Sequence, residues 1–513
     1  MNKQVYNPYM PSFEYVPDGE PHVFGGRIYL YGSHDRFDGA QFCLNDYICY
    51  SADVNDLTEW KYEGVIYRKE QDPRNQNVPA NAQPFAVKPG IEVKDENSLN
   101  PPGIHAMWAP DVVKGPDGRY YLYYCLDFLP EIAVAVCGEP AGKYEFLGFV
   151  RHKDGTALGK REGDLIQFDP GIFVDDDGTI YLYSGNAPMH KEQFDAKKGS
   201  QVMTLCEDML TLASEPKHLL PDIHEAEGTQ YEGHAFFEAS SIRKIGGRYY
   251  FVYSSVRSHE LCYAVSDKPD EGYRFGGTLV DIADIFLDGR TEAEPLNCLG
   301  NTHGGIECAA GQWYVFYHRQ TNRTNYSRQG CAEKIYFDEK GAIAQAEVTS
   351  CGLNKGPLKG CGVYPAAIAC QINRNGKQVL SMPDVMGEDY PYLTQDVPDC
   401  EPTPELLAAD AQRPVQYIKN IKDKSVIGYK YFDFNGPCKV TAAVRGKAKG
   451  RLVLAADAPE NGVGEIVIEM DSEKWLSFSG NTKPLEGVHA FYFLFEGEGS
   501  IDFETFSLEN IVR

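Results

Sequence analysis

Residues 236–255 read FFEASSIRKIGGRYYFVYSS, and this stretch decides the fold. It contains one acid, Glu238, followed by a short apolar run, a Gly-Gly turn and a second run rich in aromatic and β-branched residues. That order is typical of a β-hairpin. The same pattern occurs in four other places in the first 320 residues, and each copy begins with a polar residue. The five head residues are Asp18, Asp111, Asp169, Glu238 and His303.

The copies follow one another at the spacing of a repeat protein. Their turn glycines are Gly26, Gly118, Gly178, Gly247 and Gly311, so the steps between copies are 92, 60, 69 and 64 residues. Hairpin repeats of this size are typical of a β-propeller, in which each repeat forms one blade and cannot bury its faces without neighbours. The sequence therefore predicts an all-β fold with a five-bladed β-propeller over residues 1–350.

The head residues are the candidates for chemistry. Because the first strand of each blade borders the central channel, we expect the five heads to converge near one end of it. Grouping buried carboxylates raises their pKa values and weakens the fold, a cost that chemistry explains better than packing does. Two carboxylates acting as acid and base are the common device of glycoside hydrolysis, and a third can keep the acid protonated. His303 is either a core histidine or a ligand for a metal ion or water.

The chain is too long for the propeller alone, so a second domain is expected. Beyond about Thr349 the hairpin pattern gives way to irregular Gly- and Pro-rich sequence, and residues 388–414 are acidic and Pro-rich. Short alternating strands then resume, for example at 439–444 and 464–470. We expect a connecting segment at 351–387 and a β-sandwich at 388–513.

Charge and composition exclude several classes of partner. The net charge is -25, from 74 acidic and 49 basic residues, and such a field repels nucleic acid and anionic membranes. It is compatible with a neutral substrate. The sequence shows neither a signal peptide nor an apolar run long enough to span a bilayer, so we expect a cytoplasmic location. The 14 cysteines form no CxxC pair and are expected to be buried reduced thiols.

The heads and their flanking residues resemble the motifs of glycoside hydrolase family 43. These motifs are Asn7-Pro8 to Pro17-Asp18, Trp108-Ala109-Pro110-Asp111, Phe168-Asp169-Pro170, Glu238 and His303-Gly304. The resemblance extends over about the first 350 residues and implies an inverting enzyme on a five-bladed propeller. We expect an exo-glycosidase that releases terminal α-L-arabinofuranosyl or β-D-xylosyl residues from plant-derived arabinoxylan or arabinan oligosaccharides.

The resemblance also implies individual roles. These are Asp18 as general base, Asp169 as the acid that tunes pKa and orients, Glu238 as general acid, Trp108, Asp111 and Arg328 as substrate-binding residues, and His303 beside a calcium ion or water in the channel. One departure leaves the base open. The family usually has Asp-Pro there, whereas this chain has Asp18-Gly19-Glu20-Pro21. The distance from Asp18 to the aromatic strand fits the motif better, so Asp18 is favoured as the base and Glu20 is the alternative.

The insertion in the first repeat, the C-terminal region and the exact function allow further interpretations. The long insertion in the first repeat, from about Asn55 to Met107, is expected to shape or cover a binding site. The C-terminal region, with Tyr429, Trp475 and Phe491 to Phe506, resembles a family 6 carbohydrate-binding module, although its aromatic residues fit a sandwich core better. The alternatives for function are a galactan-directed hydrolase of the same fold and a non-catalytic carbohydrate-binding propeller.

Overall fold

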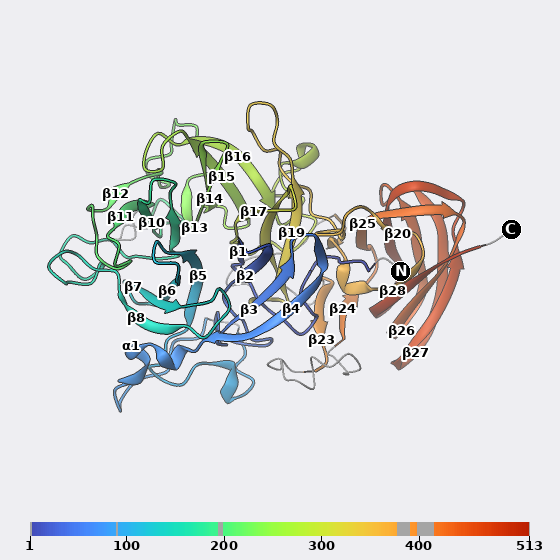
Figure 1. Cartoon of the computed structure of the whole chain (residues 1–513). Coiled ribbons are helices and arrows are strands. Elements are labelled where there is room, and N and C mark those ends of the chain that lie inside the picture. The colour runs from blue at the N-terminus through green and yellow to red at the C-terminus, as the bar shows by residue number, and fades with distance from the viewer. Residues whose placement is uncertain (1–2, 89–90, 193–198, 377–389, 398–414, 512–513) are drawn as a thin grey trace.

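Five small antiparallel sheets surround one axis in the first two thirds of the chain (Figure 1). The computed structural model describes the whole chain except residues 1–2, 89–90, 193–198, 377–389, 398–414 and 512–513. The sheets follow one another in sequence, and each is a simple meander, so each is one blade. The predicted five-bladed propeller is confirmed.

The first two blades each have four strands. They are β1 (Glu20–Phe24), β2 (Arg27–Tyr31), β3 (Tyr47–Asp53) and β4 (Asp56–Tyr67), then β5 (Met107–Lys114), β6 (Tyr120–Leu126), β7 (Ile132–Cys137) and β8 (Glu145–Phe149). The third and fourth blades also have four, namely β9 (Gly171–Val174), β10 (Ile180–Ser184), β11 (Gln201–Leu205) and β12 (Lys217–His218), then β13 (Phe236–Ile245), β14 (Arg248–Ser255), β15 (Glu260–Ser266) and β16 (Arg274–Asp281). Among the described residues the fifth blade has three, β17 (Ile306–Ala309), β18 (Gln312–Thr321) and β19 (Thr324–Ile335).

The repeated sequence pattern accounts for these blades. In every copy the aromatic run forms the second strand of the blade, and the glycine before it lies in the turn between the first and second strands. All five turn glycines have positive φ, between 80° and 87°, a conformation that strains residues with a Cβ atom. The first strands of the blades contact one another around the axis. Apolar side chains fill the space between neighbouring blades, as where Tyr31 and Tyr47 pack with Leu122 and Tyr124.

The N-terminal segment closes the ring. Asn7 lies beside β19, where its side-chain amide donates hydrogen bonds to the carbonyl of Ala332 at 3.0 Å and the carboxylate of Glu333 at 2.8 Å. Its side-chain oxygen accepts from the Ala332 N–H at 3.0 Å. A backbone bridge between Gly19 and Gly304 joins the first and fifth blades nearer the axis. The ends of the propeller are therefore joined by polar contacts and by an apolar cluster in which Tyr9 packs against Phe316.

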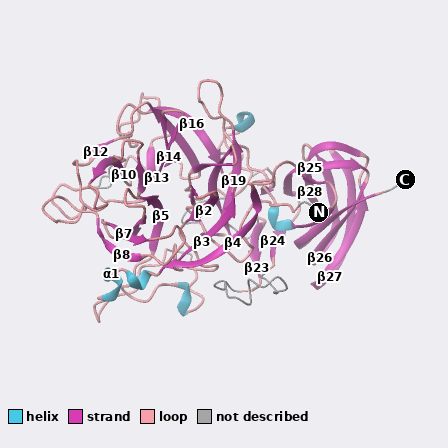
Figure 2. Ribbon diagram, viewed as in Figure 1, coloured by secondary structure: helices cyan, strands magenta, loops and turns pink. Residues whose placement is uncertain are grey.

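The short helices lie in the connections between strands (Figure 2). They are η1 (Lys69–Gln71), α1 (Pro73–Gln76), η2 (Glu96–Ser98), η3 (Leu287–Gly289) and η4 (Ala366–Ile368). The first three belong to the insertion between β4 and β5, which begins at Arg68, later than the sequence indicated, because residues 56–67 form β4. None of these helices is long enough to cross a membrane. The thirteen cysteines in the described part of the chain are free thiols.

Among the described residues, nine strands form the C-terminal domain, which extends from the propeller to the right side of Figure 1. They are β20 (Leu358–Lys359), β21 (Gly362–Pro365), β22 (Gln371–Arg374), β23 (Tyr392–Gln395), β24 (Gln416–Ile421), β25 (Ser425–Gly436), β26 (Cys438–Ala456), β27 (Gly462–Asn481) and β28 (Leu485–Asn510). The long β28 pairs with both β25 and β26, so the strands fold over one apolar core, as expected of a sandwich. The stretches 439–444 and 464–470 belong to strands of 19 and 20 residues, longer than their sequence pattern indicated.

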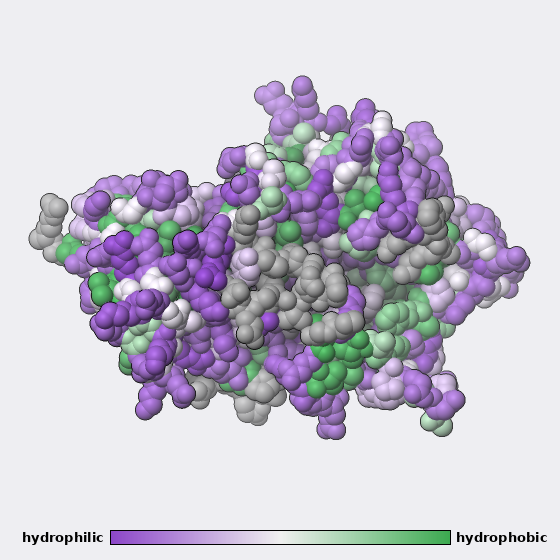
Figure 3. Space-filling model, turned by 180° about the vertical axis from the view of Figure 1, so that it is seen from behind, coloured by the Kyte–Doolittle hydropathy of each residue, from purple (hydrophilic) through white to green (hydrophobic). Residues whose placement is uncertain are grey.

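The segment expected to connect the two domains contributes to the second one. Within 351–387, β20 and β22 pair with β25, and β21 pairs with β28. The sheet therefore begins at Leu358 rather than near residue 388. The domains also share buried polar contacts, since the Lys430 ammonium lies 2.6 Å from Glu347 and 3.4 Å from Asp284. The face in Figure 3, which includes both domains, is mostly hydrophilic with smaller apolar groups.

We predict that Asn7→Ala weakens ring closure, because it leaves buried groups of β19 without their hydrogen-bond partners. Such a loss costs about 2–3 kcal/mol. Urea denaturation followed by tryptophan fluorescence measures it. The matched control is Asn55→Ala, which removes an exposed amide bonded to Asp53 and should change the free energy of unfolding by less than about 0.5 kcal/mol. Equal stabilities of the two variants would contradict this account of closure.

Candidate active site

A cavity of about 540 Å³ opens at the end of the propeller axis where the first strands of the blades begin. Its size is within the usual range of small-molecule sites. Six of the seven predicted site residues line it, and they come from all five blades: Asp18, Trp108, Asp169, Glu238, His303 and Arg328. The seventh, Asp111, lies elsewhere. The convergence expected from the repeat is therefore found for four of the five heads.

The backbone is strained where the heads enter the cavity. Asp18 has φ 55°, and Asp169 has φ 43°; Ala109 and Ala239, each next to a site residue, have φ 40° and 71°. Left-handed conformations are uncommon for residues with a Cβ atom and cluster at functional sites. The ladders of β5 and β13 also shift register beside Trp108 and Glu238, and such bulges re-aim side chains.

Arg328 is the buried cation of the site. Its Nε and Nη2 donate to the two oxygens of Asp35 at 2.8 and 2.9 Å, and its Nη1 donates to Asp18 at 2.9 Å. Burial alone would raise the pKa of Asp18, but the charge of Arg328, with a smaller contribution from His318, lowers it below its usual range. Asp18 is therefore held as a carboxylate, the state that a general base requires.

Asp169 and Glu238 form a pair of interacting carboxyl groups. Burial, and next the charge of Glu238, raise the pKa of Asp169 well above its usual range. Asp169 accepts from the Ala239 N–H at 3.2 Å, and Glu238 accepts from the Asn186 amide at 3.2 Å. Because two buried carboxyl groups this strongly linked resist losing both protons, the pair retains one near neutral pH. A protonated acid is thus available opposite an ionised base.

His303 lies against this pair, with its Nδ1 3.5 Å from Asp169 Oδ2. Burial lowers the pKa of His303 to about 4, so the ring is neutral at ordinary pH. A neutral imidazole can bind a metal ion or a water, or donate to a substrate hydroxyl.

Asp111 lies deeper along the axis than predicted. The bulge in β5 separates it from Trp108, and its oxygens accept from the N–H groups of Val112 and Ile172, both at 2.7 Å. Oδ1 of Asp111, which accepts from Val112, also lies 2.6 Å from His22 Nε2. Asp111 therefore belongs to a buried layer beneath the cavity rather than to the cavity wall.

Glu20 belongs to the same layer. Its Oε1 lies 2.8 Å from Nη2 of Arg243 and accepts from the Ser241 hydroxyl at 2.8 Å. Glu20 does not line the cavity, whereas Asp18 does. The geometry thus favours Asp18 over Glu20 as the base. The layer of Glu20, His22, Asp111 and Arg243 also fills the axis, so the cavity is closed at this end.

Two groups of side chains in the described part of the chain could hold a metal ion, Glu20 with His22 and Asp111, and His234 with Glu260 and Cys262. His303 is in neither. In the first group the oxygens of Asp111 are already hydrogen-bonded, and Arg243 supplies a positive charge to Glu20. In the second, Glu260 accepts from His234 at 2.9 Å and from Ser255 at 2.7 Å. Hydrogen bonds thus satisfy most of these groups without an ion.

Sequence reasoning missed the residues that support the site. Asp35 follows the first aromatic strand as part of Gly32-Ser33-His34-Asp35, and Asn186 follows the third as part of Ser184-Gly185-Asn186. Polar residues directly after an aromatic strand were therefore an available signal. Arg243 and His318 lie inside strands and carry no comparable signal.

The chain is similar to known proteins over its whole length. The family description "Glycosyl hydrolases family 43" matches residues 22–343. A "Xylosidase/arabinosidase" of Thermoclostridium stercorarium is 46% identical over 513 residues, which cover 99% of each chain. The "Xylosidase/arabinosidase 43A" of Humicola insolens is 28% identical over 360 residues, 64% of this chain and 96% of its own. 

Among solved structures, a glycoside hydrolase family 43 arabinoxylan arabinofuranohydrolase from Bacillus subtilis, in complex with cellotetraose, has a TM-score of 0.49 and 19% sequence identity. The alignment covers 98% of this chain and 97% of that one. The family match over most of the propeller and the full-length relative lead to one conclusion. The chain belongs to glycosyl hydrolase family 43.

Proposed function

We propose that the protein is an inverting exo-glycosidase that hydrolyses terminal α-L-arabinofuranosyl or β-D-xylosyl residues of arabinoxylan or arabinan oligosaccharides. One observation carries this proposal: three carboxyl groups from three blades line one cavity, and the buried Arg328 is hydrogen-bonded to only one of them, Asp18. A cavity closed along the axis accepts the end of a sugar chain, and the rest of the substrate extends out of the mouth.

The reaction would proceed by one displacement. Asp18 takes a proton from a water molecule, whose oxygen attacks the anomeric carbon while the bond to the leaving oxygen breaks. Glu238 donates a proton to that oxygen, so the configuration inverts. Asp18 and Glu238 belong to blades one and four, which are not neighbours in the ring. This placement supports the separation of about 6.5–9.5 Å that inverting enzymes use to admit water.

The pentose preference rests on the relatives. The proteins of T. stercorarium and H. insolens both bear the name xylosidase/arabinosidase, and the first matches this chain over its full length. Apolar walls from Phe42, Trp108 and Phe168 would pack on the sugar ring, and Arg328 would bind its hydroxyls. The galactan-directed alternative needs only a different glycone in the same cavity, so a substrate panel separates the two.

The non-catalytic alternative relied on the missing Asp-Pro motif. That departure does not remove the base, because the Asp18 carboxylate lines the cavity and is held ionised by Arg328. A propeller that only binds sugar has no use for an ionised acid in the same cavity as two carboxyl groups that share a proton.

We also propose that any calcium ion in the channel binds beside His303 largely through water. Calcium takes six to eight oxygen ligands, and the nearest acid recorded for His303 is Asp169, at 3.5 Å. The described residues therefore do not form a complete calcium site there, and no step above depends on an ion. Isothermal calorimetry of the chelator-treated protein and of its His303→Ala variant tests this assignment.

Proton NMR of the reaction tests the function directly. With aryl α-L-arabinofuranoside and aryl β-D-xyloside as substrates, we expect at least one to release its sugar first as the inverted anomer. A first product with retained configuration would contradict the single displacement, and no release from either substrate would favour the galactan-directed or binding-only alternatives.

We predict that Asp18→Asn and Glu238→Gln each lower kcat by at least about a hundredfold, the usual scale of general acid-base catalysis. Both substitutions keep the side-chain shape, and a circular dichroism spectrum checks the fold. Glu20→Gln is the comparison variant. If Glu20→Gln were severe and Asp18→Asn mild, the base would be Glu20.

We predict that Asp169→Asn moves the alkaline limb of the kcat/KM profile to lower pH. That limb reports loss of the shared proton from the Asp169 and Glu238 pair. Removing one carboxylate removes the repulsion that retains the proton, so activity is lost earlier as pH rises. Asp176→Asn, at an exposed acid of the same blade paired with Lys244, should leave the profile unchanged. An unmoved limb in Asp169→Asn would exclude this role.

A further inference from the structure

An exposed phenylalanine stands next to the cavity mouth in an unfavourable conformation. Phe128 is 72% exposed and has φ 60° in the turn between β6 and β7. Exposing a large apolar ring and holding a residue with a bulky side chain in the left-handed region both cost free energy. Asparagine or glycine would suit this turn better. Such a combination is expected where function retains the aromatic ring.

Phe128 continues an aromatic surface that begins inside the cavity. Its ring centroid is 6.2 Å from that of Trp108, which lines the cavity, and 5.4 Å from that of Phe85, on which it stacks at 25°. Trp108 also contacts Phe42 and Phe168 on the cavity side. The aromatic rings thus lead from the glycone position to the outside of the mouth. Since the other end of the cavity is closed, the leaving group extends through the mouth, beside which Phe128 lies.

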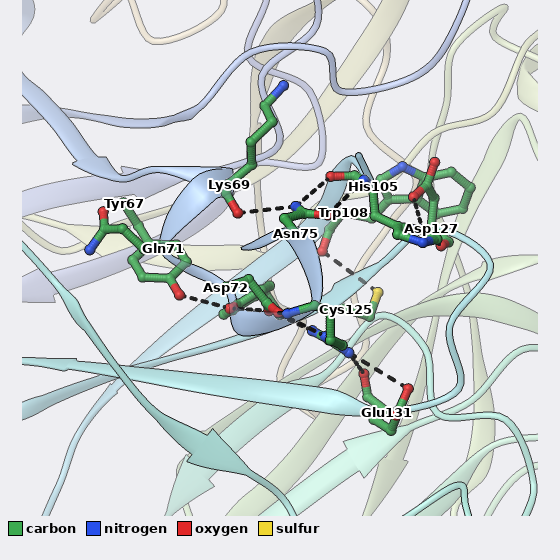
Figure 4. Close-up of polar contacts among 12 residues, drawn as sticks. Tyr67, Lys69, Gln71, Asp72, Asn75, His105, Trp108, Cys125, Asp127 and Glu131 are labelled. Atoms are coloured by element: carbon green, nitrogen blue, oxygen red, sulfur yellow. Dashed lines mark hydrogen bonds and ion pairs between the residues drawn. The ribbon is translucent and has the colours of Figure 1, made fainter. Parts of the chain in front are cut away.

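A buried polar network fixes the turn that carries Phe128 (Figure 4). Oδ1 of Asp127 accepts from the Ala106 N–H at 2.9 Å and lies 2.9 Å from His105 Nδ1. The side chain of Asn75, from the insertion, accepts from the His105 N–H at 2.8 Å and donates to its carbonyl at 3.0 Å. The Phe85 ring packs edge-on against the His105 ring at 5.1 Å.

The insertion is in turn anchored to the second blade. Asp72 accepts from the Arg74 guanidinium at 2.7 Å and from the Tyr124 hydroxyl of β6 at 2.7 Å, and Arg74 lies 3.6 Å from Glu131 of the β6–β7 connection (Figure 4). The network therefore orders both segments of the aromatic surface, the insertion with Phe85 and the turn with Phe128. A surface ordered in this way loses little entropy when a ligand binds.

We propose that Phe128, stacked on Phe85, is the binding platform for the sugar unit on the leaving-group side of the scissile bond. The ligand is a pyranose ring such as the xylosyl unit of a xylan chain, whose apolar C–H face packs on an aromatic face. The inference rests on the proposed function for the direction of the substrate. It adds a residue that selects oligosaccharides over simple glycosides, and it gives the long insertion a role.

The decisive variant is Phe128→Asn, because asparagine tolerates the left-handed backbone while removing the ring. We expect its kcat/KM on xylobiose and on an arabinosylated xylobiose to fall about tenfold, the size of one aromatic contact of about 1.4 kcal/mol. Its kcat/KM on the methyl glycoside of the same sugar should stay within about twofold, and its melting temperature should equal or exceed that of the unchanged protein. Phe128→Trp should retain the oligosaccharide activity.

The matched control is Tyr336→Asn, which removes a 65% exposed aromatic side chain after β19 in the fifth blade and should alter neither substrate. An equal fall on both substrates with a lower melting temperature would assign Phe128 a structural role and overturn the proposal. Unchanged kcat/KM on both would do the same.

Binding measurements separate this proposal from the proposed function. In the Glu238→Gln background, calorimetry should show that Phe128→Asn weakens xylotriose binding about tenfold and leaves xylose binding unchanged. If the unchanged protein cleaved neither pentoside but xylotriose binding still depended on Phe128, the function would be wrong and the platform correct. If xylotriose binding did not depend on Phe128, the platform would be wrong whatever the activity.

Discussion

The site depends on the buried ion pairs of Arg328. Three carboxyl groups drawn together out of water would all take up protons, and a site of three neutral acids has no base. The guanidinium is always charged and lies between Asp35 and Asp18, so it stabilises the ionised form of Asp18 by a direct hydrogen bond. It also lowers the pKa of Asp169, but burial and the charge of Glu238 outweigh this effect. Asp35 uses both oxygens to hold Nε and Nη2, which leaves Nη1 directed at Asp18. One side of the cavity is thereby ionised and the other protonated.

A second, largely buried arginine, Arg243, supplies a positive charge to the acids beneath the cavity. Arg243 lies 2.8 Å from Glu20 and 3.4 Å from Glu307. Burial raises the pKa of Asp111 and the charge of Arg243 opposes this rise, so that the pKa is about 7. Without this cation, the acids along the axis would have no positive charge beside them to offset the cost of burying their negative charges. The layer around Arg243 closes the channel, and closure is what makes the cavity an end-on site. Arg328 thus compensates the acids that line the cavity, and Arg243 compensates those of the layer beneath it.

The sequence was informative where the signal is local and repeated. Alternating strands, turn glycines and head residues recur in each blade, so the propeller, Asp18, Asp169, Glu238 and His303 could be predicted. Asp111 was placed in the pocket because the bulge beside Trp108 leaves no local mark. Asp35 and Arg243 meet their partners, Arg328 and Glu20, only when the ring closes. The pairing of Leu358 and Gly362 with strands more than 70 residues away could not be predicted from the local sequence either.

The C-terminal domain takes part in positioning Arg328. The turn between β18 and β19 precedes Arg328 on the same hairpin, and its Asn322 N–H donates to the Leu393 carbonyl of β23 at 2.7 Å. The Thr394 hydroxyl donates to the Asn322 side chain at 2.9 Å, and Tyr15, close to Asp18 in sequence, donates to Gln395 at 2.7 Å. The segments that carry the two partners of the central ion pair therefore both contact one strand of the second domain.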